Sequence, residues 1–156
     1  MVKLRREFKL ILFLVIIGYG LAAVSEFWVY HEIQKRLRIE ISGQYDPLVL
    51  RPSFRVKKAS LNWDEKLKVL DGDVVFAYDL RDLLIKNQIR LHVRGEVLRV
   101  QFLGDWQKIQ GIRETVLNRF DLRFALGPEG MKEIYSLQID SPEIQFGIKE
   151  SSIKMA

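Results

Sequence analysis

The chain contains no cysteine and only two histidines among its 156 residues. Without cysteine it can have no disulfide framework, no thiolate metal site and no lipid-modified cysteine. His31 and His92 are far apart in the sequence and have no cysteine as a co-ligand, so they do not have the ligand spacing of a zinc site. The sequence also lacks a G-x-S-x-G elbow, a phosphate loop and a dinucleotide-binding glycine pattern. We therefore expect a protein that is not an enzyme, with no catalytic residue, metal or cofactor.

Charge is absent from one long stretch near the N-terminus. The 16 residues LILFLVIIGYGLAAVS, from Leu10 to Ser25, are uncharged, and extension to Tyr30 adds one acid, Glu26. A helix needs about 20 apolar residues to cross the hydrocarbon core of a bilayer. The aromatic residues that end the segment are typical of a membrane interface. We expect a transmembrane anchor over residues 10–30, with Glu26 near the interface.

A cleaved signal peptide is the alternative, because Ala23-Val24-Ser25 resembles a small-residue cleavage site. The amphipathic character continues without a break through FWVYHEIQKRLRI, which favours a retained anchor. The expected organisation is then a basic cytoplasmic tail, the anchor, a juxtamembrane basic helix and a β-domain, over residues 1–9, 10–30, 31–38 and 39–156.

The net charge of +5 lies on both sides of the anchor. Residues 1–9 carry +3, residues 10–30 carry −1, residues 31–58 carry +4, and residues 59–156 carry −1. This distribution suits anionic lipid headgroups and does not suit nucleic acid, which would require the excess on the folded domain. The positive tail predicts a cytoplasmic N-terminus, with the body on the other side of the membrane. The side chains expected to meet headgroups are Lys35, Arg36, Arg38, Lys57 and Lys58.

Beyond residue 38 the dominant pattern alternates apolar and polar residues, which predicts β-strands. Seven segments show it: SFRVKKASLNW, DVVFAYDL, QIRLHVRG, VLRVQFLG, FDLRFALG, IYSLQIDS and EIQFGIK. In the first segment the alternation slips at Lys57-Lys58, which indicates a bulge or a change of face. We expect a mainly β fold with an antiparallel, curved open sheet or β-groove. The N-terminal transmembrane helix precedes it.

Two segments are expected to be helical. DLRDLLIKN has Asp79 placed to cap a short turn, with Asp82 three residues later. DWQKIQGIRETVLNRF, residues 105–120, has apolar residues near the helical spacing and Asp105 as a possible N-cap.

The stretch LDGDV places Asp71 and Asp73 on either side of a glycine. Such a pair can hold a divalent cation, but the rest of a calcium loop is missing. Asp-Gly is also a strong hairpin signal, because glycine adopts positive φ. We therefore interpret LDGDV as the hairpin between two strands.

The order of features over residues 1–105 resembles the N-terminal region of AsmA-like and TamB-like envelope proteins. The residues that carry the resemblance are Leu61, Trp63, Gly72, Val74, Tyr78, Asp79, Leu80, Leu83 and Leu84. The resemblance implies an inner-membrane protein with one N-terminal helix, a periplasmic body and a β-groove associated with phospholipid movement or envelope homeostasis. The chain is shorter than is usual in that family.

The apolar sheet face has two interpretations that periodicity does not separate, a closed core or an open lipid groove. In the groove interpretation membrane lipids are the partners, and the lipid-contacting residues are Val74, Phe76, Tyr78, Leu91, Val93, Val100 and Phe102. In the alternative, the chain is a membrane-tethered assembly module, like the LptC-like periplasmic subunits. Envelope proteins would then dock through the sheet edges or through Trp106 and Ile109.

Overall fold

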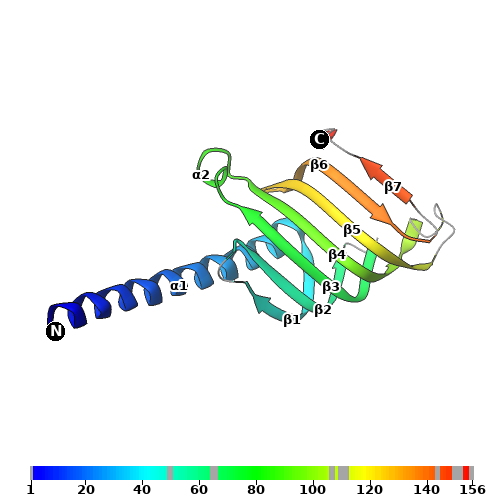
Figure 1. Ribbon diagram of the computed structural model, residues 1–156. Helices are drawn as coiled ribbons and strands as arrows, with labels where there is room; N and C mark the ends of the chain where they lie inside the picture. The colour runs from blue at the N-terminus through cyan, green and yellow to red at the C-terminus, as the bar shows by residue number, and fades with distance from the viewer. Residues whose placement is uncertain are drawn as a thin grey trace.

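The computed structural model describes residues 2–48, 51–63, 67–105, 108, 113–142, 145–148 and 153–154. It shows a long N-terminal helix followed by an open antiparallel sheet with one short helix (Figure 1). The elements are α1 (Val2–Leu37), β1 (Ile39–Pro47), β2 (Ser53–Trp63), β3 (Leu67–Asp79), α2 (Leu83–Lys86), β4 (Ile89–Phe102), β5 (Glu114–Gly127), β6 (Gly130–Asp140), β7 (Gln145–Ile148) and β8 (Ile153–Lys154). The predicted fold class, mainly β with an antiparallel open sheet behind an apolar helix, is confirmed.

The strands lie in the sheet in chain order, from β1 to β7, and each is antiparallel to the next. The short strand β8 pairs with β6. This meander agrees with the general tendency of strands that are consecutive in the chain to become neighbours in the sheet. The sequence pattern missed β1, in which Gly43 interrupts the alternation after only two buried residues, Ile39 and Ile41.

A line of residues with positive φ, which we call the bulge line, crosses the first four strands. Gly43, Lys58, Gly72 and Val97 have φ of 144°, 49°, 150° and 54°, and the strand register brings them to neighbouring positions. At this line the backbone N–H of Lys58 donates to Asp73 Oδ1 at 3.1 Å, in place of a ladder bond. Bulges of this kind change which alternate residues face inward. Apolar residues on both sides of the line therefore point to one face of the sheet.

The bulge predicted at Lys57-Lys58 belongs to this line. In β2 the buried apolar residues are Phe54 and Val56 before it and Ala59 after it. The face does not change, because the extra residue restores the inward direction.

The interpretation of LDGDV as a hairpin is wrong. Gly72 lies inside β3, and the β2–β3 connection falls between Trp63 and Leu67. A Cβ atom at Gly72 would collide with Leu98 of β4. The Asp-Gly pair therefore serves a bulge within a strand, since a bulge also uses the positive φ that glycine allows.

Two further expectations are corrected. The segments QIRLHVRG and VLRVQFLG form one strand, β4, because the bulge at Val97 looks like a break in the sequence pattern. The helix predicted over residues 105–120 is wrong from Glu114 onward, where β5 begins; residues 106–107 and 109–112 lie outside the described residues. Pairing with both β4 and β6 outweighs the helical spacing, because sheet context overrides local pattern.

The short helix α2 starts later than its capping pattern predicts. Asp79 Oδ1 accepts a bond from the backbone N–H of Arg81 at 3.0 Å, so it closes the turn before the helix. Asp82 is at the N-cap position but makes no side-chain cap bond there. Asn87, with φ of 51°, ends the helix.

The C-terminal half of α1 packs against the sheet, and its N-terminal half projects away (Figure 1). Val29 and Ile33 are fully buried in the same core as the inward side chains of the strands. Tyr30 Oη donates to the carbonyl oxygen of Ile41 at 3.0 Å, and the N–H of Ile41 donates to Gln34 Oε1 at 3.1 Å. The helix thus satisfies backbone groups on the outer edge of β1, which would otherwise be open to another strand.

Candidate functional site

The sheet residues predicted to contact lipid lie in the hydrophobic core, except Tyr78. Each of the others is at most 9% exposed: Val74, Phe76, Leu91, Val93, Val100 and Phe102. The described part of the apolar face is therefore filled by its own side chains. Lipid would reach these six residues only if the face opened, so their contact with lipid stays a prediction.

Of the predicted headgroup cations of α1, Arg36 has structural partners. Lys35 and Arg36 occupy its last turn, where positive charge stabilises the free carbonyl end of a helix. Arg36 Nε lies 2.7 Å from Glu32 Oε2, and its side chain is only 9% exposed. The Arg36 guanidinium also donates to the backbone and side-chain oxygens of Asn87 at 3.0 Å. It therefore ties the helix to the β3–β4 connection.

The other three cations lie at special backbone positions or in an ion pair. Arg38 and Lys58 have φ of 54° and 49°, the first at the α1–β1 junction and the second on the bulge line. Lys57 Nζ lies 2.9 Å from Asp46 Oδ2. Contact of these residues with headgroups stays a prediction.

A polar cluster joins α1 to the ends of β1 and β3. Glu26 is 1% exposed and accepts a bond from the backbone N–H of Leu48 at 3.0 Å. It also hydrogen-bonds the hydroxyl of Tyr45, while Tyr78 hydrogen-bonds Ser25. The acid is thus enclosed by its own domain, and its position near a membrane interface stays a prediction. Burial raises the pKa of both tyrosines, which keeps their hydroxyls neutral.

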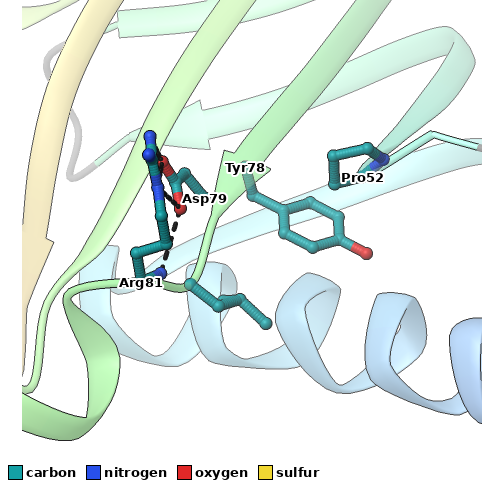
Figure 2. Close-up of a pocket in the computed structure, with 5 residues that line it drawn as sticks. Pro52, Tyr78, Asp79 and Arg81 are labelled. Carbon is teal, nitrogen blue, oxygen red and sulfur yellow. Dashed lines mark hydrogen bonds and ion pairs between the residues drawn. The ribbon is translucent and has the colours of Figure 1, made fainter.

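An open, mainly apolar pocket of about 390 Å³ lies beside this cluster. Its lining is Pro52, Tyr78, Asp79, Leu80 and Arg81. Figure 2 shows Tyr78 extending from the end of β3 over α1, with Pro52 beyond it and the Asp79–Arg81 pair on the other side. The backbone N–H of Tyr78 donates to the carbonyl oxygen of Pro52 at 2.8 Å, which fixes the two walls relative to each other.

The guanidinium group of Arg81 lies at the rim of this pocket. Arg81 Nη2 lies 2.6 Å from Asp79 Oδ2, and the Arg81 side chain is 84% exposed. The pairing lowers the pKa of Asp79. Arginine has five N–H donors, and the contacts with Asp79 use Nε and Nη2. Among the described residues nothing bonds its Nη1 group, which leaves that group for an anionic ligand at the rim.

Asp71 and Asp73 of LDGDV are the pair that could have held a divalent cation. Asp73 accepts the N–H of Lys58, and within the described ranges no group of three or more acidic or histidine side chains is placed to hold a metal ion. His92 Nε2 lies 2.9 Å from Asp121 Oδ1. This pair joins β4 to β5.

Comparison with protein-family models, curated proteins and solved structures finds no match to this chain. The membrane evidence therefore rests on the helix itself. Among the described residues, one helical stretch, Arg6–Leu37, is long and apolar enough to cross a membrane, as a single-pass anchor or a signal sequence would be.

The sequence pattern predicted Tyr78 as a lipid contact. It did not predict the pocket residues Pro52 and Arg81. Both lie just outside strands, where the pattern carries no apolar alternation. A usable signal was present, because the start of one antiparallel strand and the end of the next lie at the same sheet end. That rule brings Pro52 close to Tyr78.

Proposed function

We propose that the chain is a single-pass inner-membrane protein that contacts or transfers lipid beside the bilayer and so supports envelope homeostasis. The observation that carries the proposal is the apolar pocket between Pro52 and Tyr78, next to the helix that would cross the membrane. The AsmA-like resemblance points to the same class of function. In this proposal α1 is retained as the anchor, its N-terminus is cytoplasmic and the sheet is periplasmic.

The chemistry of the pocket suits one end of a phospholipid. Pro52, the ring of Tyr78 and Leu80 offer apolar surface to an acyl chain, whose burial is favourable in proportion to its area. Arg81 offers a guanidinium to a phosphate, a geometry that favours arginine over lysine. The pocket is open, so an acyl chain can enter it.

The test is lipid retention by the full chain, purified in mild detergent and measured by native mass spectrometry. Pro52→Trp fills the pocket and Arg81→Ser removes the rim cation, and each is expected to lower phospholipid retention several-fold. Arg99→Ser is the matched control, because Arg99 is also exposed and pairs with an acid, Glu114. Absence of lipid on the wild type, or equal retention by Pro52→Trp, would contradict the proposal.

The burial of the sheet face favours a second candidate, a membrane-tethered assembly module with no lipid groove. Six predicted contact residues are at most 9% exposed, as in a domain whose sheet serves only as a scaffold. This candidate expects a partner protein at fixed stoichiometry and no bound lipid. Trp106 and Ile109, its predicted docking residues, lie outside the described residues.

A further inference from the structure

We infer that α2 is a second membrane contact, which inserts Leu84 and Ile85 into the leaflet beside α1. The inference deepens the proposed function and rests on α1 being a membrane anchor. It differs from the pocket proposal, because it concerns the bilayer surface and no single bound lipid.

The length of free helix brings the sheet close to the bilayer. Residues 6–21 of α1 are exposed, and partial burial begins at Ala22. From Leu10 to Leu21 the helix is about 18 Å long at 1.5 Å per residue, whereas the hydrocarbon core is about 30 Å thick. A span that starts at Leu10 must therefore include residues 22–30, which the sheet already holds.

The sheet end that holds these residues is the end that carries α2. Glu26 bonds Leu48 at the end of β1, and the ring of Tyr30 lies 5.5 Å from that of Phe54 near the start of β2. Figure 1 shows α2 at this same end, on the side toward which the N-terminal half of α1 projects. Asn87 at the end of α2 bonds Arg36, which lies about 9 Å along α1 from Tyr30. When α1 crosses the bilayer, α2 therefore lies at the level of the lipid headgroups on the same surface.

The exposed side chains of α2 are those of a membrane-inserting tip. Leu84 is 95% exposed and Ile85 is 86% exposed, more than any other large apolar residue described. Arg81 and Lys86 flank them, as expected beside lipid phosphates. The tip is also held in place, because Asp82 Oδ2 lies 2.7 Å from Arg90 Nη2 at the start of β4.

A bilayer fits this tip better than a protein partner does. Two apolar side chains on a one-turn helix are far fewer than the 20–30 residues a side typical of a stable protein interface. They are sufficient for a bilayer contact whose position α1 already fixes.

The absence of cysteine allows a direct test with single-cysteine variants of the full chain. Leu84→Cys, Ile85→Cys, Val97→Cys and Ile16→Cys are labelled with a nitroxide in vesicles of phosphatidylethanolamine and phosphatidylglycerol. Collision with oxygen, relative to collision with a water-soluble nickel chelate, then reports membrane depth. Val97 is the control, being 67% exposed and about 25 Å along β4 from Ile89.

We expect the oxygen-to-nickel ratio at positions 84 and 85 to exceed that at 97 by at least three-fold, and to be highest at position 16. A water-like ratio at 84 and 85 with a membrane-like ratio at 16 overturns the inference and leaves the anchor intact. A water-like ratio at 16 overturns the inference and the anchor together. Shielding of 84 and 85 from both reagents indicates a protein partner and also overturns the inference.

Discussion

Gly72 sets how β3 and β4 pass each other at the bulge line. Its φ of 150° is one that residues with a side chain rarely adopt, and an added Cβ would meet both the side chain and the backbone of Leu98. We predict that Gly72→Ala lowers the free energy of unfolding by about 1–3 kcal/mol, through backbone strain and overpacking. Urea unfolding of the full chain in detergent, followed by the circular dichroism of the sheet, measures this.

Gly18→Ala is the matched control for that substitution, because a Cβ at Gly18 has nothing within 4 Å. It should leave the unfolding midpoint of the sheet unchanged. If Gly72→Ala is equally silent, the bulge line tolerates side chains and our account of LDGDV is wrong.

Among the elements, α1 belongs to the domain as much as to the membrane. Ile33 is fully buried, whereas Val24, on the same helix, is 68% exposed. We predict that Ile33→Ala destabilises the sheet by about 2–5 kcal/mol, the usual range for a cavity left by a large aliphatic side chain. Val24→Ala should have no measurable effect in the same urea titration. Equal effects would show that the helix does not contribute to the core.

The elements also show how far the sequence could predict this molecule. Segment 53–63 matches β2 residue for residue, because the alternation is visible on both sides of the slip at Lys57-Lys58. Alternation changes phase at the bulge in β4, which divided that strand into two predicted ones. In β5 the buried positions change from Thr115 and Leu117 to Leu122 and Phe124, so its start does not show one continuous alternation. The pocket could not be predicted from alternation, because it is formed by residues beyond strand ends, such as Pro52 and Arg81.

At the scale of the whole molecule, the orientation is testable. Positive residues before the anchor predict a cytoplasmic N-terminus, so a cysteine at Val97 should react with a membrane-impermeant thiol reagent in spheroplasts. A cysteine at Lys3 should react only after permeabilisation. The reverse labelling would invert the topology, and an intact mass below the 18.3 kDa of the chain would indicate a cleaved signal peptide.

The continuity of α1 has a consequence for how the protein meets other molecules. The helix runs without interruption from Val2 to Leu37, and β1 begins at Ile39, so no flexible tether separates a membrane segment from the sheet. If α1 is the anchor, the domain cannot swing outward to search the space above the membrane. Its encounters would be limited to lateral diffusion at one fixed height, and whatever it meets must come to that height.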